Sequence, residues 1–159
     1  MTSRLLAGAL LAVSLLTACV SGAGLTTRRT LAFADIASAP TSRHTGGPTL
    51  IVATNPDARA TLGALRPGLL LPDGVVIVAA FQGQQRTGGF AIRVTRIERD
   101  GNRLVVHAIF TSPLDNAIVT QSVSSPVHIV SIAATDASGL REAVLLDDTG
   151  AERARASVT

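Results

Sequence analysis

The chain has 159 residues, of which 47% are hydrophobic, and it carries a formal net charge of +3. All 14 basic residues are Arg, and the aromatic residues are four Phe, each inside an apolar stretch. Proteins that bind nucleic acid usually combine a concentrated basic surface with aromatic side chains that stack on bases. We therefore expect no nucleic-acid partner. Four arginines gather around one predicted hairpin and are interpreted as a solvated face of a sheet: Arg93, Arg96, Arg99 and Arg103.

The N-terminal residues carry the features of a secretory signal. Arg4 is followed by an apolar run from Leu5 to Leu16, which is much shorter than the ~20 residues of a membrane-spanning helix. The run ends in Leu16-Thr17-Ala18-Cys19, and Cys19 is the single cysteine of the chain. This junction resembles the lipobox of bacterial lipoproteins. The resemblance implies cleavage before Cys19 and a covalent lipid on it; the alternatives are an ordinary signal peptide or an uncleaved anchor.

The implied lipid predicts a location in the bacterial cell envelope, where the protein would face the periplasm or the exterior. Several acyl chains on one cysteine hold a protein durably on a membrane. Val20 stands where an aspartate would retain a lipoprotein at the inner membrane, so the outer membrane is favoured in cells that have one. Residues 1–18 are thus a predicted signal peptide, residues 19–29 a lipidated cysteine with a flexible tether, and residues 30–159 a single β-rich domain.

The first elements of this domain are predicted from apolar runs and turn residues. Thr30–Ile36 and Thr49–Ala53 are candidate strands. A short helix is predicted near residues 56–65, because Asn55 can cap it and Pro56 suits its first position. The segment from Arg66 to Gly74 contains two Pro and two Gly and is predicted to be a loop.

The rest of the domain is predicted to consist of strands. Val75–Phe81 is continuously apolar, as a central strand covered on both faces would be. A half-buried strand begins at Phe90, slips in its alternation at Arg96-Ile97 as at a β-bulge, and ends at an Asp-Gly hairpin signal. Further predicted strands lie near residues 104–110, 117–123, 127–133 and 142–146, the last with a return strand after it. The predicted fold is mainly β (α+β): a compact antiparallel, sandwich-like domain of about six or more strands with one short helix.

The stretch "GQQRTGGF" connects the central strand to the half-buried one. Its two adjacent glycines permit positive φ or a close approach of the main chain. It is either a tight turn or a loop that presents bare main chain to a partner protein. The candidate partner-binding loop consists of Arg86, Thr87, Gly88, Gly89 and Phe90.

Residues of about 75–134 resemble the C-terminal domain of the protease complex subunit family PrcB. In that domain an apolar strand is followed by Gly, polar residues, Thr-Gly-Gly and an aromatic residue, and then by a hairpin and two Ser-Pro pairs. The matching positions here are Gly83, Thr87-Gly88-Gly89, Phe90, Ser112-Pro113 and Ser125-Pro126. Phe90 replaces a common Tyr, and Val127 follows the second Ser-Pro where an aromatic is frequent.

The resemblance implies a non-catalytic accessory subunit that binds and stabilises a protein partner, such as a secreted protease, and that uses no cofactor besides the lipid on Cys19. The alternative is a small β-sandwich protease inhibitor that acts through its loops. Chagasin-type inhibitors also carry a Thr-Gly-aromatic turn, although the Asn-Pro that opens their loop is replaced here by Gln85-Arg86.

No catalytic or metal-binding pattern is found in the sequence. His44, His107 and His128 lack the spacing of a zinc motif, and we interpret the last two as half-exposed strand residues. No G-x-S-x-G motif occurs. Asp147-Asp148-Thr149-Gly150 resembles the active-site loop of retroviral-type aspartic proteases, but the residues that follow are too few for the rest of such a site. We therefore predict a hairpin turn there, no enzyme activity, no metal and no small-molecule substrate.

Overall fold

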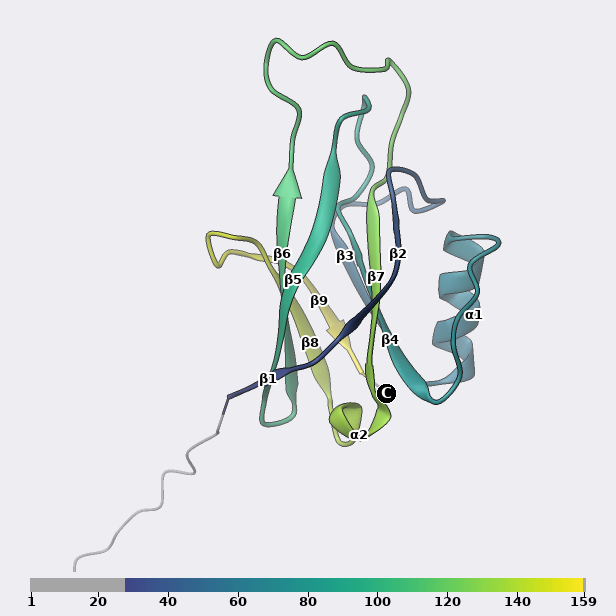
Figure 1. Cartoon of the computed structure of the whole chain (residues 1–159), viewed down its shortest axis with the longest axis vertical. Helices are drawn as coiled ribbons and strands as arrows, with labels where there is room; N and C mark the ends of the chain where they lie inside the picture. The colour runs from purple at the N-terminus through teal and green to yellow at the C-terminus, as the bar shows by residue number, and fades with distance from the viewer. Residues whose placement is uncertain (1–27, 159) are drawn as a thin grey trace, which may run out of the picture.

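The computed structural model describes residues 28–158, which form two β-sheets packed face to face and a helix on the outer face of one of them (Figure 1). The predicted signal peptide, Cys19 and most of the predicted tether lie outside these residues. The body begins with a strand at Arg29, one residue before the boundary that the sequence predicts. The mainly β, sandwich-like fold class is confirmed.

The first sheet has five strands in the order β1-β5-β6-β8-β9. They are β1 (Arg29–Leu31), β5 (Ala91–Asp100), β6 (Arg103–Thr111), β8 (Glu142–Leu146) and β9 (Glu152–Ser157). The pairs are antiparallel except β6 and β8, which run parallel. The predicted antiparallel arrangement does not extend to this pair, because the chain crosses to the second sheet after β6 before it returns as β8.

The second sheet has four antiparallel strands in the order β2-β7-β4-β3. They are β2 (Ala34–Ala39), β7 (Val127–Ala133), β4 (Val75–Phe81) and β3 (Thr49–Ala53). β4 lies between β7 and β3 and is buried on both faces, as its continuous apolar sequence predicts. β1 and β2 divide the predicted strand at 30–36 between the two sheets.

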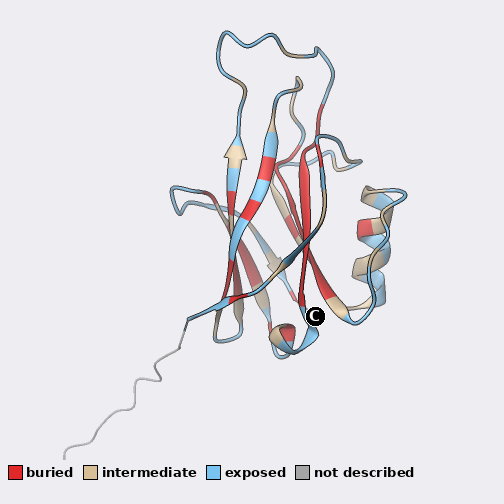
Figure 2. Ribbon diagram, viewed as in Figure 1, coloured by how far each residue is buried: buried red, intermediate tan, exposed pale blue. Residues whose placement is uncertain are grey.

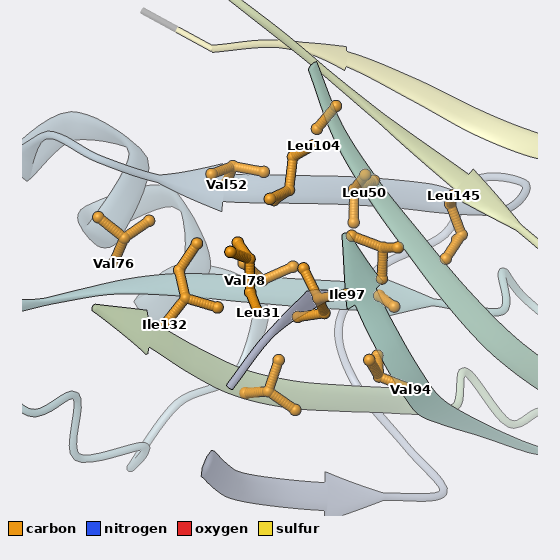
Figure 3. Close-up of a cluster of buried hydrophobic side chains, with 14 of the residues drawn as sticks. Leu31, Leu50, Val52, Val76, Val78, Val94, Ile97, Leu104, Ile132 and Leu145 are labelled. Atoms are coloured by element: carbon orange, nitrogen blue, oxygen red, sulfur yellow. The ribbon is translucent and has the colours of Figure 1, made fainter. Parts of the chain in front are cut away.

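The main core fills the space between the sheets, where alternate residues of the strands meet (Figure 3). β6 contributes Leu104, Val106 and Ala108, which the alternation of its sequence predicts, and β4 contributes Val76 and Val78 from the opposite side. Because every strand alternates its side chains between two faces, the other residues of β4 form a second apolar layer. Burial of both layers is the main stabilising contribution to such a fold.

The helix α1 (Pro56–Leu65) covers this second layer. The side chain of Asn55 accepts a hydrogen bond from the backbone N–H of Ala58 at 2.9 Å and caps the helix, as predicted. Leu62 is fully buried in a cluster that includes Ile77 and Phe81. A second helix, α2 (Ala134–Ala137), was not predicted and joins β7 to β8.

Two details of the predicted strands differ. Residues 117–123 form no strand but belong to a long exposed loop between β6 and β7 (Figure 2). Within this segment the carbonyl of Thr120 accepts a hydrogen bond from Gly88 of the neighbouring loop, and an isolated bridge just after the segment pairs Ser124 with Gln85. The bulge of β5 lies between Val94 and Arg96, slightly before the predicted position.

Candidate functional site

Three loops lie together at one end of the sandwich, which we call the loop end (Figure 1). They are residues 40–48 between β2 and β3, residues 82–90 between β4 and β5, and residues 112–126 between β6 and β7. The middle loop, 82–90, contains the candidate partner-binding residues. Hydrogen bonds join it to the loops on both sides, so the three loops form one connected surface.

The middle loop is bonded to loop 112–126 mainly through its main chain. Gln85 and Ser124 exchange two backbone hydrogen bonds, at 2.8 and 3.0 Å. The N–H of Gly88 donates to the carbonyl of Thr120 at 2.9 Å. The Ser124 hydroxyl donates to the carbonyl of Thr87 at 2.7 Å. Consequently, the carbonyl of Thr87 and the N–H of Gly88 already have hydrogen-bond partners within the protein.

Gly89 packs closely against loop 112–126, and this packing requires a glycine at the position. Its φ is +85°, which side chains other than that of Gly rarely tolerate. A Cβ at this position would lie 2.9 Å from Pro113 Cβ and 3.0 Å from Val119 Cγ1. Thr87-Gly88-Gly89 is therefore a support for loop 112–126 as well as a turn.

On its other side, the middle loop contacts loop 40–48 at Gly83. The φ of Gly83 is +92°, and a Cβ there would lie 2.7 Å from the carbonyl carbon of Gly47. The next residue, Gln84, donates its backbone N–H to the carbonyl of Gly46 at 2.9 Å. Because the opposing atoms belong to the backbone, they have little freedom to move aside, and only Gly fits here.

The buried Ser125 of the second Ser-Pro pair also holds loop 40–48. Its hydroxyl donates to the carbonyl of His44 at 2.8 Å and accepts from the hydroxyl of Ser42, with 2.9 Å between the two oxygens. The ring of His44 packs against Phe81 with 5.1 Å between centroids. His44 thus has a structural position under the loop end.

The five predicted partner-binding residues differ in exposure. Arg86 and Gly89 are exposed, whereas Thr87, Gly88 and Phe90 are half-buried. The structure brings them to the surface at the loop end, where Arg86 is the charged side chain of the group.

Exposed aliphatic side chains on loop 112–126 were missed by the sequence analysis. Leu114, Ile118 and Val123 have exposed fractions of 77%, 104% and 59%. The available signal in the sequence was the position of these aliphatic residues among polar and turn-forming residues, namely Pro, Asp, Asn, Thr, Gln and Ser. The prediction of a strand over residues 117–123 gave no indication of this exposure.

His128 joins the two sheets just below the loop end. The prediction that it is half-exposed is wrong, because only 3% of its surface is accessible. Its Nδ1 accepts a hydrogen bond from the backbone N–H of Val94 at 2.9 Å, and its Nε2 lies 3.3 Å from Asp35 Oδ1. Burial lowers the pKa of His128 below its ordinary value; the Asp35 carboxylate opposes this shift and Arg93 adds to it.

The Asp-Asp-Thr-Gly segment forms the turn between β8 and β9, as predicted. The carboxylate of Asp147 accepts hydrogen bonds from the Thr149 hydroxyl at 2.7 Å, the Thr149 N–H at 3.0 Å and the Ala151 N–H at 2.9 Å. These bonds, with Arg153 nearby, lower the pKa of Asp147 despite its burial. Asp148 is exposed, and Asp147 is fully engaged in the turn.

Beside this turn lies an open depression of about 560 Å³ on the outer face of the five-stranded sheet. His107 lines it, and its Nε2 lies 3.0 Å from the carboxylate of the buried Glu98. Arg96 also approaches Glu98, at 3.6 Å. Pairing with His107 and Arg96 offsets the cost of burying the Glu98 carboxylate.

Within residues 28–158, no group of three or more His, Cys, Asp and Glu side chains is placed to hold a metal ion. The same part of the chain contains no helix with the length and apolar character needed to span a membrane.

Residues 76–133 match the family model described as PrcB C-terminal, which confirms the predicted resemblance and its approximate bounds. The matched segment runs through β4, β5, β6 and β7 and includes both loop 82–90 and loop 112–126. This segment is therefore similar to the PrcB C-terminal domain. No curated protein and no solved structure matches the chain.

Proposed function

We propose that the protein is a lipid-anchored, non-catalytic subunit of the bacterial cell envelope that binds and stabilises a protein partner, such as a secreted protease. The observation that carries the proposal is the PrcB C-terminal match, which contains two of the three cross-bonded loops. Loops held on a rigid β scaffold are frequent binding surfaces.

The position of the first described residues supports an anchor at the N-terminus. Arg28 pairs with Asp100 at 3.4 Å, beside the β5–β6 turn, and Arg29 pairs with Asp136 of α2 at 2.6 Å. Both pairs lie at the end opposite the loop end (Figure 1). β5 has ten residues, so at ~3.3 Å per residue the two ends are about 30 Å apart. A tether from Cys19 would therefore attach to the body at the end that lies farther from the loops.

Replacement of Cys19 by Ala tests the anchored form. We expect the wild-type protein to incorporate radiolabelled palmitate and to sediment with membranes, together with its partner. The Cys19→Ala protein should lose the label and leave the membrane fraction. An unlabelled wild-type protein, or a variant that stays equally membrane-bound, would contradict lipidation.

A protease inhibitor is the second candidate, because three adjacent loops at one end of a two-sheet body could enter an active-site cleft together. The two functions predict opposite changes in the partner's activity. An inhibitor would reduce the turnover of peptide substrate by the bound protease in proportion to occupancy, whereas a stabilising subunit would maintain or increase it.

A further inference from the structure

We propose that loop 112–126 is the primary contact with the partner, and that Leu114, Ile118 and Val123 insert into an apolar cleft on a partner protein. This inference rests on the proposed function as a protein-binding subunit and specifies which residues bind and what they bind. It shifts the predicted contact from Thr87-Gly88-Gly89 to the loop that this segment supports.

The exposure of these side chains is the first reason. Within residues 28–158, the exposed large aliphatic residues are Leu70, Ile109, Leu114, Ile118 and Val123. Three of them belong to one loop, and Ile109 lies near the end of the strand that leads into it. Single exposed aliphatic residues are common, but several on one projecting segment indicate an interaction surface.

The loop is also held in place, which is the second reason. The N–H of Ala117 donates to the carbonyl of Leu114 at 2.9 Å and closes a turn within the loop. Farther along, Thr120 and Ser124 are bonded to the middle loop. A segment ordered before binding loses less conformational entropy when it binds. The Thr-Gly-Gly segment therefore contributes to binding by fixing the loop.

The chemistry of the loop favours a protein over a membrane. From Ser112 to Pro126 the loop has one charged residue, Asp115, and contains no Arg, Trp or Tyr. Segments that bind membrane surfaces usually combine basic residues with aromatic or extensive apolar ones. In addition, residues 19–28 can span roughly 30 Å at most, and they join the body at its other end. A lipid anchor would thus attach at the end of the body that lies farther from this loop.

A second copy of the chain fits less well than a different protein. An apolar depression of about 350 Å³ is lined by Phe33, Val75 and Ile132, among others. It lies near the start of β4 and the end of β7, at the end of the body opposite the loops. In copies anchored in the same membrane, each depression would lie at the attached end of the body, whereas each loop 112–126 would lie at the other end.

A photo-reactive amino acid at position 118 of the full-length, membrane-anchored protein tests the contact in intact cells. The same probe at position 70 is the matched control, because Leu70 is 89% exposed on a loop beside α1. We expect irradiation to produce one defined protein adduct from position 118 and none from position 70. Peptide mapping should place the adduct in an apolar cleft of the partner.

The role of the aliphatic side chains is tested by introducing Leu114→Ser and Val123→Ser together into the protein that carries the probe at position 118. We expect the adduct from position 118 to fall at least about tenfold, while Leu70→Ser leaves it unchanged and the melting temperatures of all variants stay equal. An adduct with lipid, an adduct with a second copy, or an adduct unaffected by the two substitutions would overturn the inference. The absence of any adduct from position 118 would also overturn it.

Failure of this inference can be told from failure of the proposed function by co-purification. If the wild-type protein and the Leu114→Ser, Val123→Ser variant recover the same partner equally, the protein binds a partner through another surface. If neither recovers a partner, the proposed function itself is wrong.

Discussion

The backbone N–H of Val94 donates a hydrogen bond to Nδ1 of His128 at 2.9 Å, and this bond joins β5 of one sheet to β7 of the other. Val94 immediately precedes the bulge of β5. β5 follows the middle loop and β7 follows loop 112–126. The bond therefore fixes the strands that carry two of the three loops. It requires an unprotonated Nδ1, because only the neutral ring can accept there.

The stability of the protein should fall as the pH decreases from about neutral. The pKa of His128 is lowered from its ordinary value of 6.5, chiefly by burial. The unfolded chain therefore binds more protons in the interval between 6.5 and the folded-state pKa. The contribution of His128 is fully present above that interval and is lost as the pH falls through it. Urea unfolding followed at several pH values between 5 and 8, a range of about three units around the ordinary His pKa, measures this dependence.

His128→Asn is the informative variant for this dependence. Its Oδ1 can still accept from Val94, but the side chain cannot be protonated near neutral pH. We expect lower stability at pH about 7.5, from lost packing, and a flatter pH dependence than that of wild type. An unchanged slope would mean that another group causes the dependence.

Gly83→Ala should be among the most destabilising single changes at the loop end. Positive φ alone costs a non-Gly residue about 1–2 kcal/mol, and the close backbone of Gly47 adds overpacking of about 1–3 kcal/mol. Gly74→Ala is the matched control, because Gly74 has a φ of +74° and open space around its would-be Cβ. Equal losses of unfolding free energy in the two variants would show that the contact with loop 40–48 contributes nothing.

Ser124→Ala should destabilise the loop end more than Thr87→Ala. The Ser124 side chain is buried and donates to the carbonyl of Thr87. Its removal leaves that carbonyl without this donor, at a cost of about 1–2 kcal/mol. Thr87→Ala keeps the bond, because the acceptor is main chain, and should cost about 0.5 kcal/mol or less. Chemical denaturation measures both, and the reverse order would argue against the supporting role of this segment.

Asp147 should have a structural role in the β8–β9 turn, and neither Asp147 nor Asp148 should have a catalytic role. Asp147→Asn is expected to destabilise the β8–β9 turn, because an amide binds the surrounding N–H and hydroxyl donors less well than a carboxylate. Asp148→Asn is expected to leave stability unchanged. The purified protein should not cleave peptides at acid or neutral pH. Pepstatin-sensitive cleavage that Asp148→Asn abolishes would refute this prediction.

Elements with strong local signals were predicted well from the sequence. Asn55 and Pro56 mark the start of α1, because they act on backbone groups close to them in the sequence. The apolar run of Val75–Phe81 predicts a central strand, because its residues favour burial on both faces. The parallel pairing of β6 with β8 has no local signal. It depends on where the chain returns after an excursion to the other sheet.

The candidate site was predicted in part. The Thr-Gly-Gly segment was located correctly as the connection between β4 and β5, but its support of loop 112–126 depends on contacts between distant residues. The burial of His128 was within reach of the sequence, because its strand is apolar on both faces and offers no exposed side. The exposure of Ile118 was not predicted, because the residues beside it favour a strand. Within residues 28–158, no neighbouring strand is available to pair with them.

The most direct test of the accessory role is purification of the full-length, lipid-bearing protein from the detergent-solubilised envelope under native conditions, with a peptidase assay of the complex. We expect stoichiometric recovery of a partner protein with peptidase activity, and a lower abundance of that partner in cells that lack this protein. Recovery of the protein alone, or increased peptidase activity in the cells that lack it, would contradict the proposed function.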